Sequence, residues 1–115
     1  DGAMARWFTE AFRAANRATV ARWRQRVVTQ NAAGYVAACH AIRDHHTLDR
    51  LAGIRVPTLV IAGEHDVGTP VAMNQAIADG IPGARCLVLP DASHLSVLEQ
   101  PAAFPAAVQG FLAGL

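Results

Sequence analysis

Asp66 and His94 are the two residues whose types and positions indicate catalysis. Each follows shortly after an apolar run with the composition of a β-strand. A carboxylate and an imidazole are two of the three groups of a Ser-His-Asp triad, in which the carboxylate orients the imidazole and the imidazole takes the serine proton. No serine of the sequence lies in a Gly-x-Ser-x-Gly turn. The sequence therefore carries an acid and a base without a recognisable nucleophile.

Two predicted strands must position this pair. Residues 58–62 lie between Pro57 and Gly63, and residues 85–89 are ended by Pro90; continuous apolar runs of this kind predict strands buried on both faces of a parallel sheet. Between them we expect a helix that is capped by Thr69, starts at Pro70 and ends near residue 79. Such a βαβ unit brings the carboxyl ends of both strands, and with them Asp66 and His94, to one edge of the sheet.

The predicted sheet is incomplete, because two strands leave unpaired backbone groups at an open edge. After the second strand we expect an irregular turn and then a helix from near Pro105, with Phe104, Val108, Phe111 and Leu112 on one face. The chain starts at Asp1 without an initiator methionine or a signal sequence, so we expect an upstream segment. That segment would complete the sheet as a companion chain, or the chain would self-associate through the open edge.

Residues 1–53 are predicted to form a helical, cap-like segment, distinct from the βαβα part at residues 54–115. Apolar residues at helical spacing predict a first helix whose stripe comprises Met4, Trp7, Phe8, Ala11, Phe12 and Ala15. Thr19 and Asn31 are the expected N-caps of a second and a third helix. The third helix is predicted to turn Tyr35, Val36, Cys39 and Ile42 inward.

Charge and composition exclude several function classes. Residues 1–56 carry nine arginines and four acidic residues, a net charge of +5, whereas residues 57–115 carry a net charge of −4. The basic run from Arg13 to Arg26 favours a solvated helix face over nucleic-acid binding, since it lacks interleaved stacking aromatics. No apolar stretch approaches the roughly 20 residues of a membrane span. Cys39 and Cys86 lack CxxC spacing, which favours buried thiols in a reducing cytoplasm.

Other residues compete for the same roles. Glu64, Asp91 and Glu99 are alternative carboxylates for the acid; strand alternation turns Glu64 away, and Asp91 is very near His94 in sequence. His65 is expected to be exposed. The spacing of His40, His45 and His46 fits no common zinc pattern, so no metal is expected. Ser93 and Ser96 are rejected as nucleophiles, because Ser93 adjoins the base and neither has flanking glycines.

The motifs of residues 54–115 resemble the carboxyl-terminal part of an α/β-hydrolase: the segment 54–63, Asp66 before Thr69-Pro70, the segment 81–84, Ser93-His94, and Glu99-Gln100-Pro101. The helical start, with the segments 6–9, 21–24 and 34–39, resembles the cap of 3-oxoadipate enol-lactonases. The resemblance implies that Asp66 is the triad acid, that His94 is the general base and that Trp7 lines the substrate pocket. The helical stripe favours core packing for Trp7 as its alternative. The serine and the oxyanion hole of the family have no counterpart in the sequence.

We therefore expect an α/β fold, the carboxyl-terminal portion of an α/β-hydrolase, with cap-like helices followed by two parallel strands and flanking helices. The expected function is that of part of a cytoplasmic serine hydrolase for an anionic lactone or ester of the 3-oxoadipate enol-lactone type. No cofactor is implied, and the chain alone is predicted to be inactive. Two alternatives stay open: a non-enzymatic interaction module, or the tail of an epoxide hydrolase or haloalkane dehalogenase, which differ chiefly at the nucleophile.

Overall fold

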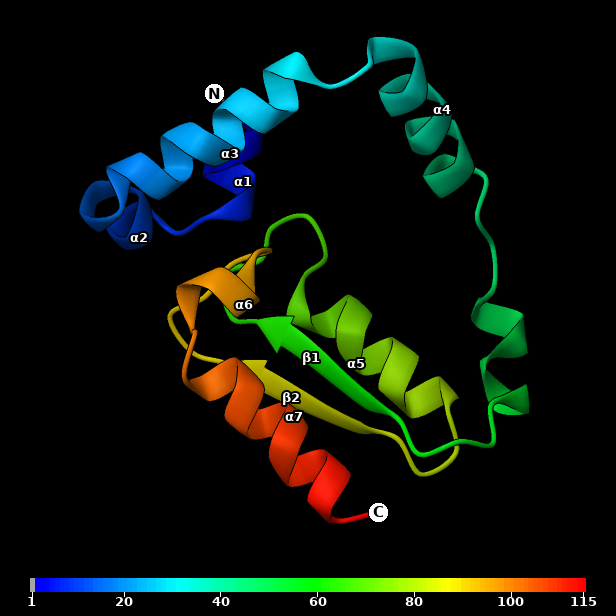
Figure 1. The fold of residues 1–115 in the computed structure, drawn as a ribbon. Helices are drawn as coiled ribbons and strands as arrows, with labels where there is room; N and C mark the ends of the chain where they lie inside the picture. Colours follow the sequence, from blue (N-terminus) through cyan, green and yellow to red (C-terminus); the bar gives the residue numbers. More distant parts are fainter. Residues whose placement is uncertain (1) are drawn as a thin grey trace.

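Residues 2–29, in the helical amino-terminal part of the molecule, lie over the carboxyl ends of two parallel strands, whereas residues 48–53 lie beside the helix that joins the strands (Figure 1). The computed structural model describes residues 2–115. The first part comprises α1 (Gly2–Trp7), α2 (Glu10–Ala15), α3 (Arg17–Thr29), α4 (Ala32–Arg43) and a 3-10 helix (Leu48–Gly53). The second part comprises β1 (Leu59–Gly63), α5 (Val71–Gly80), β2 (Arg85–Leu89), α6 (Ser96–Glu99) and α7 (Ala103–Ala113).

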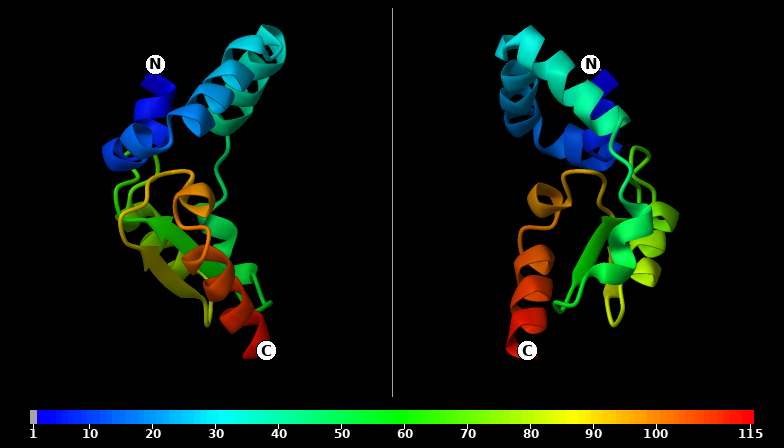
Figure 2. Two further views of the ribbon diagram at one scale, coloured as in Figure 1. Left: turned by 60° about the vertical axis from the view of Figure 1, so that its left-hand side comes forward. Right: turned by 90° about the vertical axis from the view of Figure 1, so that its right-hand side faces the viewer.

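The two strands form one parallel sheet, as predicted, with Leu59 opposite Arg85 and Gly63 opposite Leu89. Helix α5 packs on one face and α7 lies over the other (Figure 2). The predicted burial of both strand faces is wrong. Only Ala62 and Gly63 of β1 and Leu89 of β2 are buried, because a two-stranded sheet leaves much of each strand uncovered.

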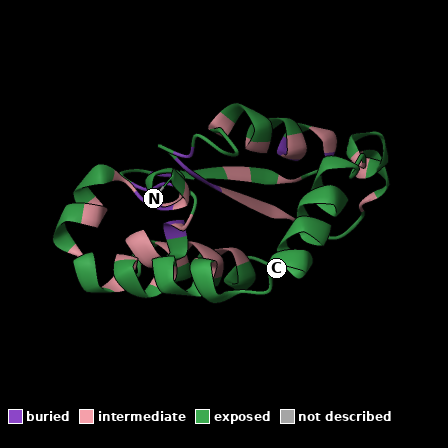
Figure 3. Ribbon diagram, turned by 90° about the horizontal axis from the view of Figure 1, so that it is seen from above, coloured by how far each residue is buried: buried purple, intermediate pink, exposed green. Residues whose placement is uncertain are grey.

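Few of the described residues are buried (Figure 3). One group of buried apolar residues lies where the strands end and comprises Met4, Phe8, Ala62, Leu89 and Ala92; Ala78 and Ile81, at the end of α5, are also buried. The ring of Phe8 stacks on Phe12, with centroids 5.2 Å apart. The amino-terminal segment is therefore joined to the sheet at the edge where Asp66 and His94 were predicted to lie.

The first helix differs from its prediction, since residues 4–15 form two helices instead of one. The break falls at Phe8 and Thr9, where the Thr9 hydroxyl accepts a hydrogen bond from the Phe12 N–H and caps α2. The predicted cap at Thr19 is also wrong: α3 begins at Arg17, and Thr19 lies within it. Hydrophobic spacing survives such a break, so the spacing alone did not reveal it.

Helix α4 begins where predicted, because the Asn31 side chain accepts a hydrogen bond from the Gly34 N–H. Its predicted inward face is wrong. Tyr35, Val36, Cys39 and Ile42 are all exposed, since no other described element covers this helix.

Of two later helices, α5 begins one residue after its predicted start, whereas α7 begins near its predicted start at Pro105. Helix α5 begins at Val71 after Pro70, without a side-chain cap from Thr69. Helix α7 begins at Ala103, two residues before Pro105. Pro105 lies in its first turn, where a backbone N–H has no intrahelical partner to lose.

Candidate active site

Asp66 lies in the turn that follows β1 and is held by the backbone of the same turn. Its Oδ1 accepts hydrogen bonds from the N–H groups of Gly68 (2.8 Å) and Thr69 (2.9 Å), the pattern of an Asx turn. Its Oδ2 accepts a hydrogen bond of 2.6 Å from the Thr69 hydroxyl. These bonds compensate the burial of the carboxylate, whose side chain is 6% exposed.

The same Oδ2 atom lies 2.8 Å from Nδ1 of His94, which follows β2. With Asp66 ionised, this contact assigns the proton to Nδ1 and leaves the Nε2 lone pair as the basic site. The His94 side chain is 42% exposed, so one side of the imidazole is held and the other is open. The arrangement is that of a base oriented by a carboxylate.

The environment of Asp66 favours its ionised form. Burial alone would raise its pKa, but the hydrogen bonds from the Thr69 hydroxyl and backbone, from His94 and from the Gly68 backbone outweigh burial. The net result is a pKa below the usual range for this carboxyl. An ionised acceptor is what the orientation of His94 requires.

Thr69 belongs to the site, although the sequence predicts it as the N-cap of a helix. Its hydroxyl donates to Asp66 instead of capping α5, and its oxygen lies 3.4 Å from Nδ1 of His94. An aspartate followed three residues later by threonine is a pattern of side-chain and backbone bonding within a turn. That signal was present in the sequence and competed with the capping signal of Thr69-Pro70.

The loop that carries His94 is packed closely against the end of β1. Ala92 accepts a hydrogen bond of 2.8 Å from the His65 N–H through its carbonyl. A Cβ atom at Gly63 would lie 2.3 Å from the Ser93 carbonyl oxygen and 2.7 Å from that of Ala92. A residue without a side chain is therefore required at position 63 for the loop to approach the strand.

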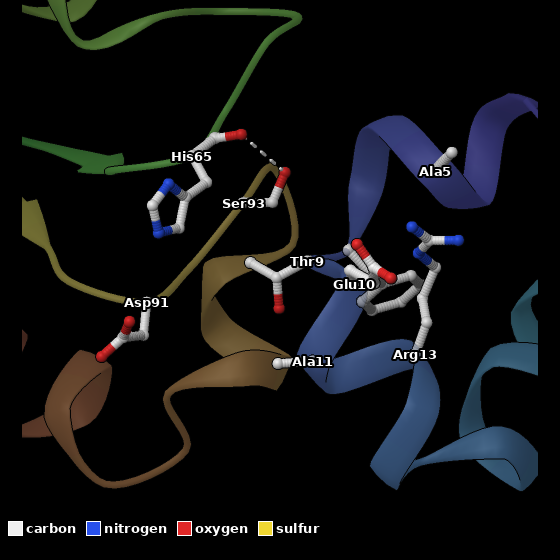
Figure 4. Close-up of a pocket in the computed structure, with 9 residues that line it drawn as sticks. Ala5, Thr9, Glu10, Ala11, Arg13, His65, Asp91 and Ser93 are labelled. Carbon is white, nitrogen blue, oxygen red and sulfur yellow. Dashed lines mark hydrogen bonds between the residues drawn. The ribbon is translucent and has the colours of Figure 1, made fainter.

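Ser93 is 3% exposed and its hydroxyl contacts two backbone carbonyls. The hydroxyl oxygen lies 2.9 Å from the Arg6 carbonyl oxygen. It lies 3.3 Å from that of His65 (Figure 4). Neither contact is with the imidazole of His94. Ser96, the other rejected nucleophile, is also buried.

A pocket of about 150 Å³ opens beside His94. Its lining residues are Arg6, Trp7, Gly68, Thr69 and His94. Trp7 and His94 thus line one pocket, to which Arg6 also contributes. A larger cavity, of about 370 Å³, includes Thr9, Arg13, His65 and Ser93 and excludes both Asp66 and His94 (Figure 4). The smaller pocket is therefore the one at the candidate site.

The alternative carboxylates lie elsewhere. Among residues 2–115 the structure gives no hydrogen bond from His94 to Glu64, Asp91 or Glu99: Glu64 accepts from the Asp91 N–H, and Glu99 contacts Thr9 and Ser93. His65 is exposed, as predicted. Glu64, His65 and Asp91 place one ligand atom each within 4.8 Å of one another, but all three are exposed. Exposed acidic groups gather in this way without a metal ion.

The family follows from comparison with known proteins. The family model described as alpha/beta hydrolase fold matches residues 4–101. The chain belongs to the α/β-hydrolase fold family. This confirms the predicted fold class and the resemblance on which it was based. No helix within residues 2–115 combines the length and the apolar character needed to cross a membrane.

Several relatives of this α/β-hydrolase chain act on lactones. It is 36% identical to 3-oxoadipate enol-lactonase 2 of Acinetobacter baylyi over 110 residues, which cover 96% of this chain and 41% of that protein. The solved enol-lactonase from Burkholderia xenovorans superposes with a TM-score of 0.94 at 36% identity, covering 98% of this chain and 43% of that one. Est816, an N-acyl homoserine lactone degrading enzyme, superposes with a TM-score of 0.83 at 31% identity, over 96% of this chain and 45% of its own. The chain thus spans about two fifths of the length of these relatives.

Proposed function

We propose that this chain supplies the acid and the base of a serine hydrolase that opens a carboxylated lactone or ester of the 3-oxoadipate enol-lactone type. The 2.8 Å contact between Asp66 Oδ2 and His94 Nδ1 carries the proposal, because it leaves Nε2 available as a base beside an open pocket. The nucleophile is proposed to lie on a segment outside residues 1–115. The similarity to enol-lactonases supports the choice of substrate.

The proposed reaction has two stages. His94 Nε2 takes the proton of the serine hydroxyl as its oxygen attacks the lactone carbonyl, and it returns that proton to the ring oxygen as the acyl–oxygen bond breaks. A water molecule then attacks the acyl-enzyme as His94 Nε2 takes one of its protons, and His94 returns that proton to the serine oxygen as the acyl–serine bond breaks and the carboxylic acid is released. Asp66 keeps its negative charge throughout and stabilises the imidazolium that forms at each stage.

The pocket suits an anionic substrate. Arg6 and Trp7 line it together with His94, and residues 1–56 carry a net charge of +5. A guanidinium can hold a substrate carboxylate by paired hydrogen bonds, and an aromatic ring can pack on a planar lactone. Trp7 is accordingly proposed as a substrate-binding residue.

The test is a chimaera in which residues 1–115 replace the matching part of the Acinetobacter baylyi enol-lactonase. We expect this chimaera to hydrolyse 3-oxoadipate enol-lactone, measured by acid release at constant pH. His94→Gln and Asp66→Asn should each lower kcat by about 10³-fold, because base and tautomer control are lost. His46→Gln, an exposed histidine outside the site, is the matched control and should leave kcat unchanged. A folded chimaera that hydrolyses the lactone equally well with His94→Gln would contradict the proposal.

A further inference from the structure

Glu99, the last residue of α6, lies between the loop that carries His94 and the turn that joins α1 to α2. We propose that Glu99 is a positioning residue that fixes these two segments to each other, so that His94 and Trp7 face one pocket. The catalytic meaning of this role rests on the proposed function. The structural coupling itself is testable without turnover.

Both carboxylate oxygens of Glu99 are engaged, each with a different segment. Oε1 accepts hydrogen bonds of 2.8 Å from both the N–H and the hydroxyl of Thr9, the N-cap of α2. Oε2 accepts a bond of 2.6 Å from the N–H of Ser93, the residue before His94. Thr9 and Ser93 lie 84 positions apart in sequence and on facing segments in space (Figure 4). One side chain therefore connects the amino-terminal helices with the base.

Two further hydrogen bonds join the amino-terminal helices to the loop that carries His94. The Ser93 hydroxyl donates to the Arg6 carbonyl at 2.9 Å, and the Leu95 N–H donates to the Trp7 carbonyl at 3.0 Å. The residues on either side of His94 are thus both bonded to the end of α1. Trp7 and His94 also line one pocket. The contacts between the end of α1 and the loop that carries His94 therefore set the geometry of that pocket.

The chemistry of these contacts requires a carboxylate. An ionised carboxylate only accepts hydrogen bonds, which matches the three donors around Glu99. Bonds to a charged acceptor are shorter and stronger than neutral ones, in keeping with the 2.6 Å distance to Ser93. Glutamine has nearly the same shape, but its NH₂ group would face one of these donors without bonding to it. Glu99→Gln therefore removes one contact while preserving volume.

Amide hydrogen exchange in the full chain tests the coupling. We expect Glu99→Gln to increase exchange about tenfold or more at Thr9 and Ser93, and also at Leu95, which Glu99 does not contact. The Arg85 N–H, bonded to the Thr58 carbonyl just before β1 and far from Glu99 in the sheet, serves as the internal reference and should exchange at its original rate. Glu10→Gln, an exposed glutamate of α2, is the matched control and should leave all four amides unchanged.

Two results would overturn the proposal. Unchanged exchange at Leu95 would show that Glu99 stabilises only its direct partners, and faster exchange at Arg85 as well would show a general loss of stability. If Glu99→Gln does not fold, amide exchange in the wild-type chain tests the proposal instead. The proposal requires one common opening of Thr9, Ser93 and Leu95, with equal protection after correction for intrinsic rates, and unequal protection would refute it.

The catalytic consequence is measured in the enol-lactonase chimaera. Misplacement of the base should lower kcat about tenfold in Glu99→Gln, with a smaller change in KM, while Glu10→Gln leaves both constants unchanged. An inactive parent chimaera would refute the proposed function and leave the exchange result to decide the role of Glu99. An active chimaera in which Glu99→Gln keeps full kcat would refute positioning of the base.

Discussion

The imidazole of His94 is bonded to a carboxylate on one side and exposed on the other, and this arrangement suits a general base. Nδ1 lies 2.8 Å from a buried carboxylate, whereas 42% of the side chain is exposed toward a pocket. A free imidazole would rotate and exchange tautomers, and both freedoms are reduced by a fixed acceptor. Asp66 in turn is fixed by Thr69 and by the Gly68 backbone. The orientation of the base therefore depends on a turn of four residues after β1.

The lowered pKa of Asp66 predicts how stability depends on pH. The carboxyl binds its proton more weakly in the folded chain, so the unfolded chain takes up more protons below its ordinary pKa of about 4. Stability from Asp66 is present above that pH and is lost as the pH falls through the folded pKa. Urea denaturation from pH 6 to pH 2 should show a larger loss of unfolding free energy for the wild type than for Asp66→Asn.

A companion variant separates the causes of this effect. His94→Gln removes one hydrogen bond to Asp66 but leaves those from Thr69 and Gly68, so it should keep most of the pH dependence. Parallel pH profiles for the wild type and Asp66→Asn would contradict the prediction.

The sequence predicts that Asp66 and His94 lie together, but it does not predict the residues that hold their loops in place. Asp66 and His94 were predictable because strand ends of a βαβ unit meet at one edge. Thr69 was assigned to a helix cap, because two local signals overlap at that residue. The contacts of Glu99 with Thr9 and Ser93 join distant parts of the chain. Nothing in local spacing indicates such contacts, which depend on how the two parts pack.

At the scale of the elements, the site depends on how closely the loop after β2 approaches the end of β1. Gly63→Ala would place a Cβ atom 2.3 Å from the Ser93 carbonyl oxygen, so the strand end or the loop must move. We expect a loss of about 2 kcal/mol in the free energy of unfolding, measured by urea denaturation, because backbone cannot yield as a flexible side chain does.

Gly110→Ala is the matched control for this substitution. Gly110 lies within α7, and a Cβ atom there meets nothing within 4 Å. Alanine should therefore raise stability by about 0.5–1 kcal/mol through its higher helix propensity. Equal effects of the two alanines would show that the approach at Gly63 carries no strain.

Prediction of the elements was best where a local interaction defines them. Asn31 was found as the cap of α4 because its side chain bonds to the Gly34 N–H three residues later. The break at Thr9 was missed because Glu99, ninety residues away, holds the Thr9 backbone. Residues 85–89 were found as a strand, but their burial was overestimated because burial depends on neighbours that periodicity does not reveal.

At the scale of the whole molecule, large apolar side chains and free sheet edges remain uncovered within residues 2–115. Tyr35, Val36 and Ile42 of α4 are 48%, 52% and 76% exposed. Within the described residues the sheet consists of β1 and β2, so each of these strands has one edge without a partner strand there. Unpaired strand edges favour association with another chain, and exposed apolar area adds to the driving force.

The chain by itself is therefore expected to self-associate, and sedimentation velocity should show species larger than the 12.2 kDa monomer at concentrations of tens of micromolar. Partner strands should compete for the free edge of β1. Addition of the amino-terminal part of the Acinetobacter baylyi enol-lactonase should replace these species with a one-to-one complex, because its strands would pair with that edge and its surface would cover α4. An unrelated α/β protein with a closed sheet is the control and should change nothing. A monomer at every concentration, with or without the added segment, would show that the free edge of β1 does not drive association.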